Sequence, residues 1–154
     1  MKKFLSVLLI VCLVFVSGCE KVTEEGKFKE GTYTGEAVDN YNNEVNTATA
    51  KITVDKDGKI TEVYLDTTYT KDGVETTKKA LGKEYGMKKG NSSYGSADYE
   101  WYEQVEALEK AIVEKQGIDF LKLDADGYTD AVSTCTIKID ALYVALQNAL
   151  NKAK

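Results

Sequence analysis

The stretch TATAKITV (residues 47–54), DKDG (55–58) and KITEVYLDT (59–67) decides the fold. Apolar and polar residues alternate in its first part, which is typical of a strand with one buried face. Asp57-Gly58 stands between the two runs and favours a hairpin. We expect the buried face of the first strand to comprise Ala48, Ala50, Ile52 and Val54.

The segments on either side extend this hairpin into a meander. Gly31 to Val38 alternates loosely and predicts another strand, whereas the turn-forming residues from Asn40 to Asn46 predict a loop. Lys71-Asp72-Gly73 is a further turn signal, across which Thr68 to Thr70 could continue the sheet. We therefore expect at least three antiparallel strands.

Beyond residue 75 the apolar period becomes helical. Asp98–Gln116 has the clearest pattern, with Ser96 or Asp98 as its N-terminal cap and Gly117 at its end. The predicted fold is a single α+β domain, an antiparallel β-sheet meander followed by helices packed on the sheet. Asp140 is the expected cap of the last helix. The three predicted helices are Thr76–Met87, Asp98–Gln116 with Trp101, Val105, Leu108 and Ile112 on its apolar face, and Asp140–Lys152 with Leu142, Leu146, Ala149 and Leu150 on its apolar face.

The N-terminal segment has the form of a secretory signal. Lys2 and Lys3 precede an apolar run from Leu5 to Val16, and Ser17-Gly18-Cys19 follows directly. A small-residue site that runs into a cysteine is the bacterial lipoprotein pattern, in which a lipid is attached to the Cys19 sulfur. A transmembrane helix is disfavoured because spanning a bilayer takes roughly 20 apolar residues. We expect residues 1–18 to be the signal peptide, 19–30 the lipidated cysteine and tether, and 31–152 the domain.

This interpretation places the protein on the extracytoplasmic face of the cell membrane, held by acyl chains at Cys19. Lys2 and Lys3 leave with the signal, so the net charge falls from −5 to −7 over the remaining 136 residues. Such an acidic chain is not expected to bind nucleic acid. Cys12 also leaves, so Cys135 would remain as a lone thiol without a disulfide partner.

Several residue types that carry catalysis are missing. The chain has no His and no Arg, which excludes Ser-His-Asp and Cys-His sites, His-ligated metals and guanidinium clamps. Asp124-Ala125-Asp126-Gly127 faintly resembles a calcium loop, but its twelfth position is Cys135 instead of glutamate. We expect no catalytic constellation and no metal site, so an autonomous enzyme is disfavoured.

The segment DAVSTCT (residues 130–136) is the candidate site. Its hydroxyls and backbone N–H groups, near the start of the last predicted helix, could hold a phosphate. An ordinary capping loop explains the same residues. Cys135 is either a buried small hydrophobe or a reactive thiol, and no His is present to activate it.

The same segment resembles the attachment motif of the FMN-binding domain family, extracytoplasmic flavoprotein domains of membrane redox complexes and lipoproteins. The residues that match this motif are Asp130, Ala131, Val132 and Ser133. Thr136 stands where the family carries its modified threonine. The resemblance covers most of residues 28–150. Its other parts are GTYTGEA (31–37), ITV (52–54) and DGKI (57–60) in the opening strands, and YGM (85–87) and EWY (100–102), which resemble the lipoprotein branch called major membrane immunogen.

The resemblance implies that a flavin transferase joins FMN to the Thr136 oxygen through a phosphodiester, and that the protein passes electrons between membrane redox partners. It implies a cofactor site comprising Thr136, Asp130, Ser133, Thr134 and Cys135, and Tyr94 is a candidate to stack on the flavin ring. The family's Gly-Ala is Thr134-Cys135 here. Non-covalent flavin therefore stays open, as does a non-redox ligand-binding or interaction lipoprotein that has lost its flavin. A role of the released signal as a peptide messenger is a smaller possibility.

Overall fold

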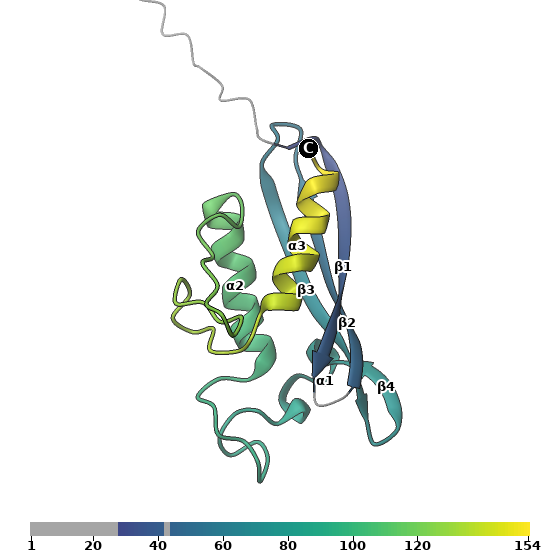
Figure 1. The fold of residues 1–154 in the computed structure, drawn as a ribbon, viewed down its shortest axis with the longest axis vertical. Coiled ribbons are helices and arrows are strands. Elements are labelled where there is room, and N and C mark those ends of the chain that lie inside the picture. The colour runs from purple at the N-terminus through teal and green to yellow at the C-terminus, as the bar shows by residue number, and fades with distance from the viewer. Residues whose placement is uncertain (1–27, 42–43) are drawn as a thin grey trace, which may run out of the picture.

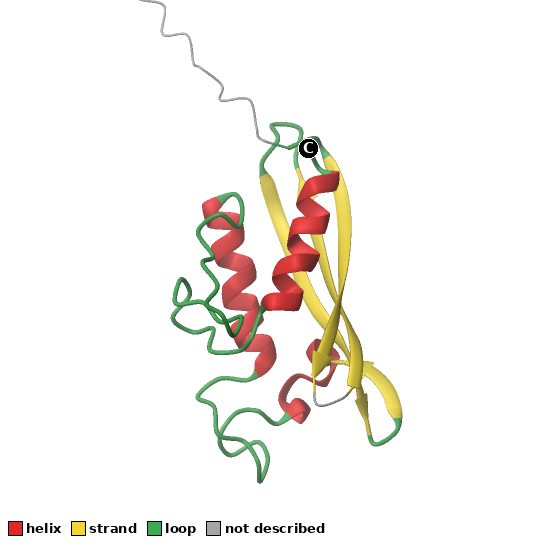
Figure 2. Ribbon diagram, viewed as in Figure 1, coloured by secondary structure: helices red, strands yellow, loops and turns green. Residues whose placement is uncertain are grey.

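Four antiparallel strands, each paired with the next along the chain, form a sheet in the computed structural model, which describes residues 28–41 and 44–154 (Figure 1). Helices pack on this sheet, so the predicted single α+β domain is confirmed (Figure 2). The strands are β1 (Gly31–Tyr41), β2 (Glu44–Val54), β3 (Ile60–Lys71) and β4 (Val74–Thr77). The helices are α1 (Lys78–Leu81), the 3₁₀ helix η1 (Gly82–Tyr85), α2 (Trp101–Lys115) and α3 (Asp140–Lys152).

The hairpin between β2 and β3 forms where residues 55–58 predict it. Asp55 Oδ1 accepts the N–H groups of Asp57 and Lys59, each at 2.9 Å. Gly58 has a φ of 71°, a conformation that costs glycine little. The side chain of Asp55 and the freedom of Gly58 together close the turn.

The alternation predicted for residues 47–54 is also confirmed. Ala48, Ala50, Ile52 and Val54 are at most 2% exposed. Helix α3 packs mainly on β1 and β2, and α2 packs on β3, so both helices cover this face (Figure 1). The apolar residues predicted for the two helices are buried with them.

The first two strands are longer than predicted, and the expected loop from Asn40 to Asn46 is wrong. Asp39 pairs with Asn46 and Asn40 pairs with Val45, so the ladder runs on through residues with low strand propensity. Asn46 is 7% exposed. Pairing and burial override local propensity here.

A fourth strand follows the predicted turn at residues 71–73. Asp72 and Gly73 both have positive φ, and Lys71 pairs with Val74. Thr76 and Thr77 belong to this strand and not to the expected helix Thr76–Met87. Within that range only α1 and η1 are helical, and Thr77 caps α1 by accepting the Ala80 N–H.

The predicted caps of the two longer helices need correction. Helix α2 begins at Trp101 with a capping box of Glu100 and Glu103, instead of Ser96 or Asp98. It ends at Lys115, and Gln116 with φ of 56° takes the left-handed position that Gly117 was expected to fill. Helix α3 has the predicted bounds, but Ile139 is its cap residue and Asp140 is its first helical residue.

Helix α3 approaches β1 closely at Gly35. A Cβ atom added to Gly35 would overlap the backbone of α3 at Ala145 and Ala149. These two alanines are fully buried, as are Ala48 and Ala50 on β2. Small residues on both surfaces therefore allow the close helix–sheet contact.

Polar side chains of the helices bind the backbone of β1 and of the part of β3 that β4 does not cover. On β1, Asn148 donates to the Glu36 carbonyl at 2.9 Å and Lys152 to the Thr34 carbonyl at 2.7 Å. On β3, Gln116 accepts the Ile60 N–H and donates to the Ile60 carbonyl, both at 2.8 Å. These bonds occupy strand-edge groups that would otherwise be open to a further strand.

The folded part reaches back to Phe28, ahead of the boundary expected at residue 31. Phe28 is 7% exposed, and the Lys29 N–H donates to the Ala153 carbonyl at 2.7 Å. The predicted signal peptide, Cys19 and most of the tether lie outside the described residues. Over residues 28–41 and 44–154, no helix has the length and apolar character needed to cross a membrane.

Candidate functional site

The candidate segment, residues 130–136, belongs to a loop that leads into α3. Asp124 Oδ1 accepts the N–H groups of Asp126 and Tyr128 at 2.9 Å each and so closes the first turn of this loop. The Ile139 N–H then donates to the Gly127 carbonyl at 2.8 Å. Gly127 has φ of 89° and lies against the side chains of Lys138 and Asp140. The loop is thereby fastened to the start of α3.

Burial alternates along the end of this loop. Cys135, Ile137 and Ile139 are buried, whereas Thr136 and Lys138 are exposed. The three inward side chains belong to the hydrophobic core. This alternation turns the Thr136 side chain outward.

Thr136 is held by a residue of α2. Its backbone N–H donates to Gln104 Oε1 at 2.7 Å, and its hydroxyl donates to the same oxygen at 3.1 Å. Gln104 is fully buried, and its Nε2 donates to the Tyr99 carbonyl at 3.2 Å and contacts Met87 Sδ at 3.4 Å. Gln104 therefore connects the candidate segment with the residues that precede α2.

The other predicted site residues differ in exposure. Asp130 and Ser133 are exposed, Thr134 is half-buried and Cys135 is 4% exposed. Burial raises the pKa of the Cys135 thiol, although the thiol accepts the Ile137 N–H. Thr134 and Cys135 are absent from the non-glycine residues with positive φ, so in the described chain Thr134 needs no glycine-like conformation. Thr134-Cys135, in place of the family's Gly-Ala, therefore causes no strain from a positive φ.

Tyr94 lies apart from this segment. It is 93% exposed in the loop before α2, and no hydrogen bond or ring contact among the described residues joins it to residues 130–136. The buried carboxylate of Glu100 fastens the loop by accepting the Met87 and Lys88 N–H groups at 3.0 and 3.1 Å and the Asn91 amide at 2.8 Å.

Two other tyrosines are connected to residues that contact or follow Thr136. The backbone of Tyr99 shares Gln104 with Thr136, and Tyr128 is near enough to Lys138 to affect its titration. Their side chains are 44% and 43% exposed. Asp140, whose carboxylate is 2.9 Å from Lys138 Nζ, is the main cause of the raised pKa of Lys138.

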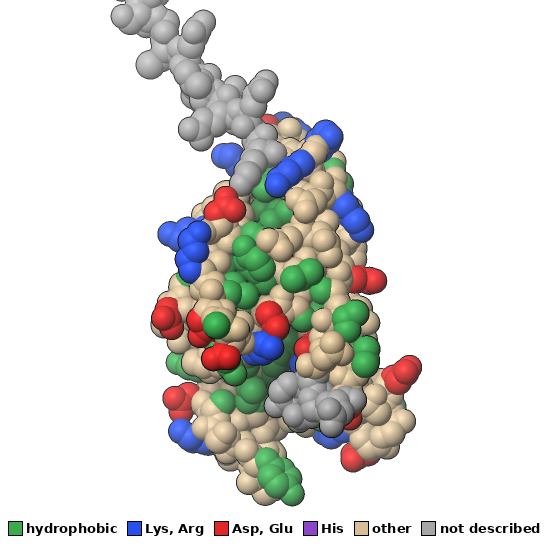
Figure 3. Space-filling view, in the orientation of Figure 1, with side chains coloured by type: hydrophobic (Ala, Val, Ile, Leu, Met, Phe, Trp, Pro, Cys, Tyr) green, Lys and Arg blue, Asp and Glu red, His purple; other side chains and the backbone are tan. Residues whose placement is uncertain are grey.

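A buried cation lies on the same side of α2. Lys78 Nζ is 3.3 Å from Asp39 Oδ2, and it lies 5.6 Å from the Trp101 ring centre and 6.0 Å from that of Tyr85. Trp101 and Gln104 are three residues apart on α2 and so share a face. Trp101 is 4% exposed, in agreement with its predicted place in the core. Hydrophobic surface is visible near the seam between α2 and α3, with acidic and basic side chains around it (Figure 3).

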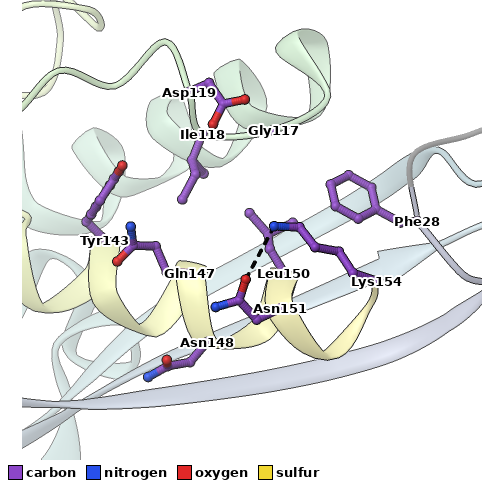
Figure 4. A pocket seen from close by; sticks show the side chains of 10 residues that line it. All are labelled: Phe28, Gly117, Ile118, Asp119, Tyr143, Gln147, Asn148, Leu150, Asn151 and Lys154. Atoms are coloured by element: carbon purple, nitrogen blue, oxygen red, sulfur yellow. Dashed lines mark hydrogen bonds between the residues drawn. The ribbon is translucent and has the colours of Figure 1, made fainter.

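A pocket of about 260 Å³ lies along α3, from Tyr143 to Lys154 (Figure 4). Gln147 and Asn151 line it with amide groups, and Asn151 accepts from Lys154 Nζ at 3.4 Å, whereas the amide of Asn148 donates to the Glu36 carbonyl on β1. Phe28 and the residues after α2 complete it. None of residues 130–136 lines this pocket, so it is separate from the candidate segment.

Sequence reasoning missed Gln104, Glu100 and Lys78. Gln104 had a recognisable signal, because a lone amide stands between Trp101 and Val105 on an otherwise apolar helix face. Glu100 and Lys78 carried no comparable signal. In the part of the chain that the structure describes, no group of three or more Cys, Asp or Glu residues is arranged to hold a metal ion.

Comparison with protein-family models, with curated proteins and with solved structures found no match to this chain.

Proposed function

We propose that this protein is a membrane-anchored extracytoplasmic lipoprotein that carries FMN on Thr136 and acts as an electron carrier. The observation that supports it best is that Thr136 is exposed and stands at the position where the FMN-binding family, which residues 130–136 resemble, carries its flavin. A covalent bond would keep a small cofactor from diffusing away outside the cell.

The residues around Thr136 suit a flavin phosphate. Lys138 is exposed two residues further on, and its ammonium, which pairs with Asp140 at 2.9 Å, supplies a positive charge near a phosphodiester. Thr134 has an ordinary φ, so the loop needs no glycine there to present Thr136. Tyr99 and Tyr128 are the half-exposed rings best placed to contact the flavin ring, in preference to Tyr94.

In this proposal the chain binds and orients the cofactor, and its own side chains catalyse no reaction. Bound FMN supplies reversible one- and two-electron chemistry. Asp130, Ser133 and Thr134 form the loop that a flavin transferase approaches, and Cys135 anchors that loop in the core. The lipid at Cys19 keeps the domain near membrane redox partners.

The test is co-expression of the full chain with a flavin transferase. The wild type is expected to be yellow and to show flavin fluorescence in a denaturing gel, and Thr136→Ala should show none. Thr32→Ala is the matched control, because it removes an exposed threonine hydroxyl on β1, outside residues 130–136. A wild-type chain without fluorescence contradicts covalent attachment, and one that also binds no FMN in solution contradicts the flavin proposal.

A non-redox ligand-binding lipoprotein is the second candidate. The pocket along α3, between Tyr143 and Lys154, favours it, because this pocket contains no residue of the candidate flavin segment. A colourless protein that takes up no FMN, but is stabilised against heat by a small polar ligand, would support this alternative.

A further inference from the structure

We infer that Gln104 is the positioning residue that orients the Thr136 hydroxyl for flavin attachment. The inference rests on the proposed function. It names a residue on α2, 32 positions from Thr136 in sequence, as the group that directs the reacting oxygen.

The hydrogen bonds fix the direction of the hydroxyl proton. A backbone N–H can only donate, so the Thr136 N–H at 2.7 Å requires the oxygen of the Gln104 amide to face it. The amide nitrogen then faces the Tyr99 carbonyl at 3.2 Å, which is its acceptor. The hydroxyl, 3.1 Å from the same amide oxygen, must therefore donate to it.

This arrangement presents the oxygen as a nucleophile. With its proton directed inward to Gln104, the Thr136 oxygen turns its lone pairs outward. Gln104 is fully buried and hydrogen-bonded at both ends, so its amide holds this orientation before any partner arrives. Orienting a reacting atom in advance lowers the entropic part of the barrier.

Attachment needs an activated donor, a phosphoanhydride of FMN such as FAD, bound by the transferase. The Thr136 oxygen forms a bond to the FMN phosphorus, and the bond from that phosphorus to the AMP oxygen breaks. AMP leaves with the electron pair of that bond, and the hydroxyl proton passes to a base of the transferase, because an amide carbonyl is too weak a base. The esterified oxygen no longer donates, so the 3.1 Å bond to Gln104 is lost while the 2.7 Å bond from the Thr136 N–H remains.

The test compares the rate of flavin attachment in full-length variants co-expressed with the transferase. Gln104→Met keeps the side-chain volume and removes the acceptor, and we expect attachment at least about tenfold slower than in the wild type. Gln116→Met is the matched control. It removes a similar amide from the end of the same helix, where it bonds to Ile60 and not to Thr136, and its rate should stay within about twofold of the wild type.

A structural readout is independent of flavin loading. In the unmodified protein, Gln104→Met should shift the Thr136 amide proton resonance and speed its exchange with solvent, whereas Gln116→Met should leave both unchanged. Gln104→Glu keeps an acceptor oxygen and is expected to restore attachment. If Gln104→Met does not fold, a folded Gln104→Glu chain that gains no flavin overturns the inference.

The outcomes separate the two proposals. Wild-type and Gln104→Met chains that gain flavin at the same rate overturn the role of Gln104 and leave the proposed function standing. If flavin attachment is slowed equally in Gln104→Met and Gln116→Met, the cause is general destabilisation, and this result also overturns the role of Gln104. A wild-type chain that gains no flavin overturns the proposed function and this inference with it.

Discussion

Two buried polar side chains at the start of α2 organise the surface around Thr136. Glu100 binds the loop that follows η1 through Met87, Lys88 and Asn91. Gln104 binds the loop that precedes α3 through Thr136. Both are fully buried, where an unpaired polar group would cost about 1–3 kcal/mol, so each bond constrains its loop.

The burial of Cys135 predicts that its thiol reacts slowly with labelling reagents in the folded protein. In a chain that begins at Glu20 and so has Cys135 as its one cysteine, native thiol labelling at pH 8 should be at least about 100-fold slower than labelling in urea, because the thiol reacts only when the core opens. Ellman's reagent measures both rates. A native rate within tenfold of the unfolded rate would place the thiol at the surface.

The pH dependence of this thiol has a defined sign. Its pKa is raised in the folded state, so the unfolded chain loses the proton first as the pH increases. The contribution of Cys135 to stability is therefore complete below the ordinary thiol pKa and is lost as the pH rises toward the folded value. Cys135→Ala should flatten this alkaline fall in the free energy of unfolding.

At the scale of elements, the two long helices protect the sheet edges while they cover its face. Asn148 and Lys152 of α3 bind carbonyls of β1. On β3, Gln116 binds Ile60, and Glu109 of α2 accepts the Leu65 N–H at 2.6 Å. Burial raises the pKa of Glu109, and its 2.6 Å ion pair with Lys79 opposes this rise.

The contact of α3 with β1 predicts a large effect of one methyl group. Gly35→Ala should lower the free energy of unfolding by about 1–3 kcal/mol, because the added Cβ meets the backbone of α3 and the helix must move. Thr34→Ala, at the exposed neighbouring position, should change it by less than about 0.5 kcal/mol. Urea denaturation measures both. Equal stability of Gly35→Ala and the wild type would mean that α3 is not packed this closely.

The sequence predicts those elements whose apolar period is strong. Ala48 to Val54 and the apolar face of α2 are buried as expected, because alternation and helical spacing are local properties. The extension of β1 through Asn40 and the short β4 depend on pairing with other strands, which local propensity does not encode.

The sequence likewise predicts some features of the candidate site and not others. Residues 130–136 stand out in sequence, and the outward position of Thr136 follows from burial on either side of it. The role of Gln104 depends on a contact between segments 32 residues apart, and the Glu100 cap depends on a loop that folds back onto α2. Such contacts are visible only once the helices are placed on the sheet.

For the whole molecule, α3 separates the first described residues from Thr136. The chain enters near the C-terminal end of α3, where the Lys29 N–H binds the Ala153 carbonyl, and Thr136 lies before its N-terminal end. Thirteen helical residues span about 20 Å. In the proposed function, this distance displays the flavin at the end of the domain away from the tether.

The proposed membrane anchor is tested by lipid labelling. Cys19→Ala in the full chain should abolish incorporation of an alkyne fatty acid, because the proposal attaches the lipid to that sulfur, whereas Cys12→Ala should keep it. Gel fluorescence after coupling of a dye to the alkyne measures both. Label retained in Cys19→Ala would contradict the lipoprotein interpretation of residues 16–19.

The central claim is that Thr136 carries FMN, and tandem mass spectrometry of the peptide that contains residues 130–136 tests it most directly. The full chain, co-expressed with a flavin transferase, is expected to yield this peptide with the mass of an FMN phosphodiester localised to Thr136. An unmodified Thr136 in the wild type, or a flavin localised to Ser133 or Thr134, would contradict the claim.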